Sequence, residues 1–155
     1  MELNKSFTLV LLIKGRHEFT YRWLIYMNKI NFKYPILIGD GQNDDETMKM
    51  IKKINFNKNL NITYYRYDTH SGYSDYYKMK NDILSKVKTK FVMLCDNDDF
   101  ILPSGLKDQI NFLSKNDEYI SASGRILNFE IDGYDYVCYG EKPVFLEPCS
   151  YFRLE

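Results

Sequence analysis

Three aspartates, Asp96, Asp98 and Asp99, fall in the stretch LCDNDDF at residues 94–100, directly after an apolar run. Two unit charges about 4 Å apart repel by roughly 4 kcal/mol at an effective dielectric constant near 20, so the cluster costs stability unless the charge is compensated. Carboxylate oxygens suit Mg²⁺ or Mn²⁺, and such an ion would remove the repulsion while holding a diphosphate. The aspartates alone leave a structural alternative equally open: they cap the helix expected from Pro103 or form a side-chain turn.

Three earlier runs of apolar or β-branched residues are also followed by stretches rich in polar and small residues. These stretches are KGRHE at residues 14–18, GDGQNDD at residues 39–45, and residues 68–73. If each run is a strand of one parallel sheet, all four stretches lie at its carboxyl edge, where α/β proteins bind ligands. His17 and His70 lie in two of them and would suit a diphosphate contact, although surface histidines without a role are commoner. The spacing therefore predicts one ligand site at this edge.

The elements that would position these stretches alternate between strand and helix. Continuous apolar runs predict buried strands at residues 7–13, 35–38 and 91–95, and a β-branched, aromatic run predicts another at 61–67. Apolar residues at three- and four-residue spacing predict helices over about 18–30, through Met48 to Ile54, over about 76–87, and from Pro103, with Leu106, Ile110 and Leu113 facing inward. This order predicts an α/β fold with a doubly wound, mostly parallel sheet.

The last part of the chain has a different pattern. ISASGRILNFE at residues 120–130 and YDYVCYG at 134–140 predict two strands joined by a tight turn at Asp132-Gly133, an antiparallel C-terminal addition. The final stretch, CSYFRLE at residues 149–155, contains no evident closing element.

Composition excludes several classes of protein. The chain has 155 residues, which suits one domain, and its 21 Lys+Arg balance its 21 Asp+Glu, which argues against a nucleic-acid-binding protein. The longest apolar stretch, LVLLI at 9–13, is too short for a transmembrane segment, and no signal peptide is evident. The three cysteines lack CxxC spacing, so neither a disulfide framework nor a zinc site is indicated. We expect a cytoplasmic protein, at most peripheral at the inner face of the membrane.

The order of elements, together with IGDGQNDDET, KMKNDI and LCDNDDFILPSGL, resembles the family 2 glycosyltransferases of the GT-A fold over residues 7–113. That family has a strand ending in Asp-Gly-Ser-x-Asp, a later Arg-Asn before an apolar residue, and Asp-x-Asp-Asp before Pro-x-x-Leu. The resemblance implies a metal-dependent, inverting enzyme that moves a sugar from a nucleoside diphosphate sugar, a UDP-sugar being favoured, to a hydroxyl of a saccharide or lipid-linked acceptor. The usual setting of such relatives is bacterial surface polysaccharide assembly.

The resemblance also implies roles for residues of the three motifs. Asp40 would recognise the nucleotide base, with Gly41 allowing the tight turn. Asp96 would face the ribose and diphosphate, and Asp98 would coordinate Mn²⁺ or Mg²⁺. Asp99 would support the loop or contact the acceptor side.

Further positions match less closely. Lys80 stands where the family has arginine and would contact a phosphate, or else is a solvated helix lysine. Asn81 matches the family's asparagine, in a supporting role. Arg16 keeps the last position of the family's Pro-x-Tyr-Asn-Arg motif, which lines the nucleotide, whereas Ile13, Lys14 and Gly15 depart from that motif. In the second motif, Gly39 replaces the first of the two aspartates that commonly precede the glycine, here Gly41.

The family carries an acceptor-binding half after its Asp-x-Asp strand and places the catalytic base there. We therefore expect a single domain over residues 1–155, with a nucleotide-binding part at 1–118 and only a partial acceptor-side part at 119–155. An alternative is a non-catalytic nucleotide-sugar-binding or scaffolding domain of a larger protein. Carboxylates are available as a base, but none lies in a recognisable motif and none is assigned; they are Glu130, Asp132, Asp135, Glu141 and Glu147.

Overall fold

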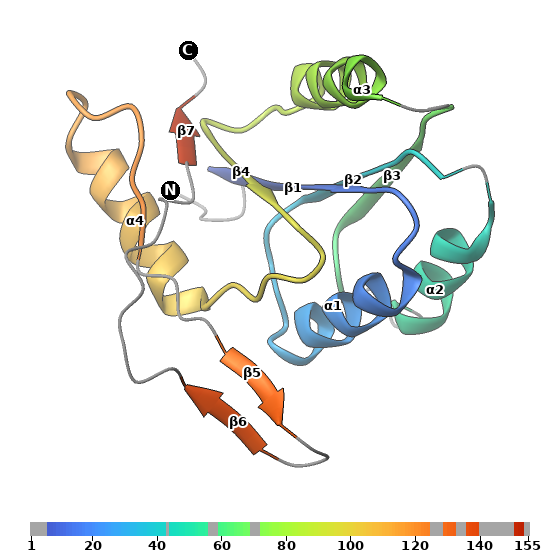
Figure 1. Cartoon of the computed structure of the whole chain (residues 1–155). Coiled ribbons are helices and arrows are strands. Elements are labelled where there is room, and N and C mark those ends of the chain that lie inside the picture. Colours follow the sequence, from blue (N-terminus) through green and yellow to red (C-terminus); the bar gives the residue numbers. More distant parts are fainter. Residues whose placement is uncertain are drawn as a thin grey trace.

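The computed structural model describes residues 6–42, 44–55, 59–68 and 72–124, and the backbone of 129–132, 136–139 and 151–153. Strands and helices alternate along the first part of the chain (Figure 1). The strands are β1 (Phe7–Ile13), β2 (Ile36–Asp40), β3 (Ile62–Arg66), β4 (Phe91–Cys95), β5 (Phe129–Asp132), β6 (Tyr136–Tyr139) and β7 (Tyr151–Arg153). The helices are α1 (His17–Lys29), α2 (Glu46–Ile54), α3 (Tyr73–Ser85) and α4 (Pro103–Lys115).

The main sheet has the strand order β3-β2-β1-β4-β7. Strands β1 to β4 run parallel, and Ile13 pairs with Asp40, which pairs in turn with Arg66. The chain therefore moves outward from β1 to β3 and then crosses back to place β4 on the other side of β1. This order confirms the predicted α/β fold with a doubly wound, mostly parallel sheet.

Helices cover both faces of the sheet, which explains the continuous apolar sequence of β1. Leu9 and Leu11 belong to a core that also contains apolar residues of α1, α2 and α4. Val10 points to the opposite face, where it packs in a smaller cluster with Ile83 of α3. Figure 1 shows α3 on one side of the sheet and α1 and α2 on the other. The three inward residues predicted for the last helix are buried, as expected; they are Leu106, Ile110 and Leu113.

Helix α3 approaches β2 closely at Gly39. A Cβ atom added there would lie 3.0 Å from Ile83 Cδ1, 3.0 Å from Leu12 Cδ2 and 3.3 Å from Tyr67 Cε2. These three neighbours are apolar carbons of the cluster beneath α3. The aspartate that the family commonly has at this position would therefore lack both space and polar partners, which gives a physical reason for the departure.

Two antiparallel pairings involve the later residues. Strands β5 and β6 form a separate two-stranded sheet, with Phe129 opposite Tyr139. Strand β7 pairs with β4, with Arg153 opposite Phe91, although the sequence predicted no element there. A three-residue strand is too short to show a period. The turn predicted at Asp132-Gly133 includes residues 133–135, which lie outside the described part.

No helix in the described ranges is long and apolar enough to cross a membrane.

Candidate active site at the carboxyl edge of the sheet

Two predicted site residues meet at the carboxyl edge of neighbouring strands. Arg16 follows β1 and Asp98 follows β4, and the two strands lie side by side in the sheet. Arg16 Nη2 donates a hydrogen bond to Asp98 Oδ2 at 2.8 Å, which forms an ion pair. The sheet thus brings together two residues that are 82 positions apart. The sequence predicts Arg16 at the nucleotide and Asp98 at the metal ion, but it does not predict their direct contact.

The backbone around Arg16 is held in an unusual conformation. Gly15 has a φ of +64° and Arg16 a φ of +53°, both in the left-handed region, so the chain turns sharply into α1. That region favours glycine, and a non-glycine residue there is uncommon. The Arg16 guanidinium carbon lies 4.2 Å from the centre of the Phe19 ring. The turn and the ring together direct the guanidinium toward the loop after β4.

Asn97 fastens the acidic loop to the beginning of α1. Its side chain is buried, and its Nδ2 donates to Thr20 Oγ1 at 3.0 Å and to the Arg16 carbonyl oxygen at 3.4 Å. Sequence reasoning missed this residue. The available signal was its position between two aspartates in a tight turn, where one side chain of the series must face inward while its neighbours face water.

The aspartates after β4 neither cap helix α4 nor form a side-chain turn. The N-cap of α4 is Leu102, and no side chain caps this helix. Asp96 and Asp99 are joined by a backbone hydrogen bond of 3.3 Å, from the Asp99 N–H to the Asp96 carbonyl oxygen. Within the described residues, neither carboxylate of this pair makes a side-chain hydrogen bond that would define a turn. The three carboxylates are therefore exposed at the edge without a structural task of that kind.

Repulsion between the aspartates, expected from their spacing, raises the pKa values of two of them. Desolvation raises the pKa of Asp96, and the charge of Asp98 raises it further, while Arg16 acts in the opposite direction. Desolvation likewise raises the pKa of Asp99, followed by the charges of Asp96 and Asp98. Negative charge is therefore only partly compensated at this loop, which favours a cationic ligand.

The carboxylates fit a cation that shares its coordination with a ligand. Among the residues that the structure describes, no group of three His, Cys, Asp or Glu side chains could hold a metal ion by itself. Mg²⁺ is usually bound by one or two carboxylates together with substrate phosphates and water, not by a cage of protein ligands. Asp98, with Asp96 and Asp99 nearby in sequence, is a donor set of that kind.

Asp40, which the sequence predicts to contact the nucleotide base, is fully buried. Its side chain is 0% exposed, and both carboxylate oxygens accept hydrogen bonds from the protein. Oδ1 accepts from the Gln42 N–H at 2.8 Å, and Oδ2 accepts from the Tyr64 hydroxyl at 3.0 Å. Gly41 N–H donates to the Ile13 carbonyl oxygen at 2.8 Å, which links the turn to β1. Asp40 thus shapes the turn that follows β2.

Tyr64→Phe is expected to lower the free energy of unfolding by about 1–2 kcal/mol at neutral pH, because the buried Asp40 carboxylate loses a donor. Burial, followed by the charge of Asp40, raises the pKa of Tyr64 from 10.0 to about 12. The folded protein therefore holds this proton more tightly than the unfolded chain, so the stability that Tyr64 contributes is complete below pH 10 and is lost as the pH rises through 12. Urea unfolding across this range should show a shallower alkaline loss in the variant.

Tyr73→Phe is a matched control for this prediction, because Tyr73 is 85% exposed. It should leave both the neutral stability and the alkaline slope unchanged. If the two variants behave alike, the Tyr64–Asp40 hydrogen bond does not stabilise the turn.

Arg66 also supports the loop after β2, although sequence reasoning assigned it no role. Its Nη2 donates to the Asp44 carbonyl oxygen at 2.6 Å, and the guanidinium is paired with the Asp45 carboxylate. His17 faces the same loop, with Nε2 3.5 Å from Asp44 Oδ1. These contacts hold the end of β3 and the start of α1 against the segment that leads into α2.

Lys80 and Asn81 lie on α3 and are not joined to the Arg16–Asp98 pair. Lys80 is partly buried and Asn81 is exposed, and neither side chain makes a hydrogen bond or ion pair with another described residue. Tyr76 lies one turn before Lys80 on the same helical face. Desolvation raises the pKa of Tyr76, and the charge of Asp96 raises it further, so the first turns of α3 approach the acidic loop.

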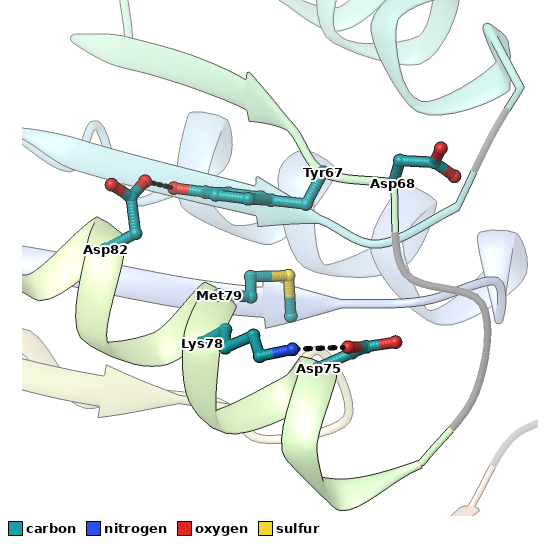
Figure 2. A pocket seen from close by; sticks show the side chains of 6 residues that line it. All are labelled: Tyr67, Asp68, Asp75, Lys78, Met79 and Asp82. Carbon is teal, nitrogen blue, oxygen red and sulfur yellow. Dashed lines mark hydrogen bonds and ion pairs between the residues drawn. The ribbon is translucent and has the colours of Figure 1, made fainter.

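A second acidic region lies between α3 and the end of β3. It is a hollow of about 230 Å³ lined by Tyr67, Asp68, Asp75, Lys78, Met79 and Asp82 (Figure 2). The Tyr67 hydroxyl donates to Asp82 Oδ2 at 2.6 Å, and Lys78 Nζ lies 3.5 Å from Asp75 Oδ1. Lys78 compensates the charge of Asp75, and Lys86 Nζ lies 3.0 Å from Asp82 Oδ2, so the hollow is a weaker candidate for a cation than the loop after β4.

Several predicted candidates have side chains outside the described part of the chain. His70, Asp135, Glu141 and Glu147 lie outside the described residues. Glu130 and Asp132 lie on β5, of which only the backbone is described.

Comparisons with known proteins agree with this architecture. The model of glycosyl transferase family 2 matches residues 29–149. The chain is similar to S. aureus TarS, with a TM-score of 0.65 and 19% identity over 96% of this chain and 28% of TarS. TarS 1–349 in complex with UDP-GlcNAc gives a TM-score of 0.60 and 17% identity over 96% of this chain and 45% of that one. No curated protein gives a significant match.

A further solved structure shows the same fold. It is the mannosyltransferase PcManGT from Pyrobaculum calidifontis in complex with GDP-Man and Mn²⁺, with a TM-score of 0.63 and 13% identity over 79% of this chain and 36% of that one. The chain thus spans less than half of the length of each of these structures.

Proposed function

Because the chain belongs to glycosyl transferase family 2, whose model matches residues 29–149, we propose that it binds a nucleoside diphosphate sugar and transfers the sugar to an acceptor hydroxyl. The observation that carries the proposal is the meeting of Arg16 with Asp98 at the carboxyl edge, within a loop of three carboxylates. Two proteins of the same fold, TarS and PcManGT, were solved with UDP-GlcNAc and with GDP-Man and Mn²⁺. These two complexes support a nucleotide-sugar donor for this chain.

Different residues at the edge would contact different parts of the donor. Asp98, supported by Asp99, would hold Mn²⁺ or Mg²⁺, and Asp96 would face the ribose and diphosphate. Arg16 is a cation that a diphosphate can recognise through the fork of its guanidinium. The turn at residues 40–42 would carry the base, with Asp40 and Gly41 fixing its shape. Lys80 and Asn81 keep their proposed roles as a phosphate contact and a supporting residue.

The proposed transfer is a substitution at the anomeric carbon of the sugar. The acceptor oxygen forms a bond to this carbon from the face opposite the diphosphate, the bond to the diphosphate oxygen breaks, and its electron pair leaves with the diphosphate. The configuration is inverted, and the proton of the acceptor hydroxyl passes to a carboxylate base, to which we assign no residue. A bound divalent cation would stabilise the negative charge that develops on the departing diphosphate.

Titration calorimetry with UDP, GDP, dTDP and CMP, each with and without Mn²⁺, tests the donor site. We expect one nucleoside diphosphate to bind at least about tenfold more tightly with Mn²⁺, because the ion neutralises both the carboxylates and the diphosphate. CMP lacks a diphosphate and should gain least. If no nucleotide binds, or if binding is indifferent to the metal, the proposed site is wrong.

A non-catalytic donor-binding or scaffolding domain of a larger protein is the second candidate. The chain covers only 28% of TarS and 36% of PcManGT, and no base is assigned. Metal-dependent nucleotide binding without donor hydrolysis or transfer to any saccharide would favour this candidate. UDP release that depends on both donor and acceptor would favour the enzyme.

Other expectations from the sequence stay predictions. They are the saccharide or lipid-linked acceptor, the cytoplasmic location with at most peripheral membrane attachment, the setting in surface polysaccharide synthesis, and the division into parts at 1–118 and 119–155.

A further inference from the structure

Arg16 is the built-in counter-ion of the acidic loop. Among the residues that the structure describes, it is the one cation in ion-pair contact with the carboxylates of residues 96–99, and it contacts Asp98 Oδ2 at 2.8 Å. In the absence of a ligand, the guanidinium therefore provides part of the compensation that a divalent cation would provide.

The guanidinium is held in this place by contacts that do not involve Asp98. The left-handed backbone of Arg16 directs the side chain, Asn97 Nδ2 donates to its carbonyl oxygen at 3.4 Å, and the Phe19 ring lies 4.2 Å away. Arg22 lies at 4.5 Å from the centre of the same ring, but makes no ion pair with Asp98. The chain thus contains two arginines on one aromatic ring, of which only Arg16 reaches the carboxylate.

We propose that Arg16 and the divalent cation compete for the carboxylate of Asp98, so that the donor-free protein binds the cation weakly and takes it up together with the diphosphate. A cation bound by Asp98 Oδ2 would stand next to a guanidinium and be repelled by it. A diphosphate removes this conflict, because its oxygens accept the guanidinium hydrogen bonds and also coordinate the cation. This inference rests on the proposed donor site and adds an order to its assembly.

The expected size of the competition follows from the exposure of the pair. The side chains of Arg16 and Asp98 are 52% and 40% exposed, so water and salt screen their attraction. Exposed ion pairs of this kind correspond to roughly two- to fivefold in an equilibrium constant. Removing the guanidinium should therefore tighten Mn²⁺ binding to the nucleotide-free protein by about that factor, and by less at high salt.

The test measures free Mn²⁺ by electron paramagnetic resonance at low ionic strength, without nucleotide. Arg16→Gln should bind Mn²⁺ about two- to fivefold more tightly than the natural protein. Arg22→Gln, which removes the other guanidinium over Phe19, should not. Arg16→Lys keeps the charge and should fall near the natural protein. Circular dichroism confirms that each variant is folded.

Two further measurements complete the test. In the Asp98→Asn background, Arg16→Gln should give no gain in Mn²⁺ affinity, because the shared carboxylate is gone. With UDP present, Arg16→Gln should weaken binding of UDP with Mn²⁺ by about tenfold, because a charge-assisted contact to the diphosphate is lost. Unchanged Mn²⁺ affinity in Arg16→Gln, an equal gain in Arg22→Gln, or a gain that survives Asp98→Asn would overturn the inference.

The outcome is separable from that of the proposed function. If no variant binds UDP, the donor site is wrong, yet the Mn²⁺ titrations without nucleotide still report on competition at Asp98. If UDP binds with Mn²⁺ but the arginine variants do not differ in Mn²⁺ affinity, the donor site stands and the competition is refuted.

Discussion

Asp98→Asn is expected to abolish the Mn²⁺ dependence of nucleoside diphosphate binding and to reduce sugar transfer by about 100-fold or more. The substitution keeps the shape of the side chain but removes its negative charge, which a hard divalent cation requires. Metal stabilisation of a developing oxyanion is worth several kcal/mol, and a loss of about 2.7 kcal/mol already corresponds to 100-fold in rate. Titration calorimetry with UDP and Mn²⁺, and a UDP-release assay with and without EDTA, measure the two effects.

The stability of this variant should change little. The ion pair that it breaks is about half exposed, and such pairs contribute roughly 0–1 kcal/mol. Asp108→Asn is a suitable control, because Asp108 is an exposed aspartate on α4. A loss of binding in both variants would indicate a general effect of charge. Metal-dependent binding that persists in Asp98→Asn would contradict the assignment of the cation to this carboxylate.

Gly39→Asp is expected to destabilise the protein by about 3–5 kcal/mol, although it would restore the residue that the family commonly has there. The new Cβ would lie 3.0 Å from side-chain atoms of both Ile83 and Leu12, and the carboxylate behind it would enter an apolar cluster. Burying a charge without a partner is costly, and the group would instead be forced to take up a proton or to displace α3. Chemical unfolding followed by circular dichroism measures the loss.

Two control substitutions separate the causes. Gly39→Ala tests space alone, and we expect a loss of about 1 kcal/mol, because the atoms it meets are ends of flexible side chains. Gly105→Asp introduces the same carboxylate on α4, where the added Cβ would meet no atom within 4 Å beyond the local backbone. Stability should therefore stay within about 0.5 kcal/mol. A Gly39→Asp variant as stable as the natural protein would show that α3 does not pack on β2 as described.

The first four strands and the four helices could be predicted from the sequence because their signals are local. A run such as FTLVLLI is apolar at every position only when both faces of a strand are covered, and the structure shows helices on both faces. The bounds moved by a few residues; α1, for example, begins at His17 rather than Glu18. Strand β7 could not be predicted, because pairing with β4 depends on residues distant in sequence.

The candidate site was predictable at the level of its edge but not at the level of its contacts. The predicted strand order places the polar loops at the carboxyl edge of the parallel strands, where α/β proteins bind ligands, and the structure has this order. The strand order does not say which side chains turn inward. Asp40 was expected to contact the base, yet Tyr64 on the neighbouring strand covers one of its oxygens. That contact depends on the register between β2 and β3, which single-sequence patterns do not contain.

The contact between Arg16 and Asp98 could not be predicted either, because it also depends on which strands are neighbours. Each residue was assigned from its own motif, and the contact arises because β1 and β4 are neighbours in the sheet and because Arg16 adopts a left-handed backbone. Asn97 shows the same limit. Its inward direction depends on Thr20 in α1, which the sequence places far away.

The central claim is that a cation and a nucleoside diphosphate bind together at the loop after β4. Paramagnetic broadening of amide resonances by Mn²⁺ in the presence of UDP tests its location, and the 18.5 kDa chain is small enough for such spectra. We predict that the resonances of Arg16 and of residues 96–99 broaden first, and that those of Asp68 and Asp82 in the second acidic region broaden later. Broadening centred on Asp68 and Asp82, with sharp resonances at Arg16 and residues 96–99, would contradict the account.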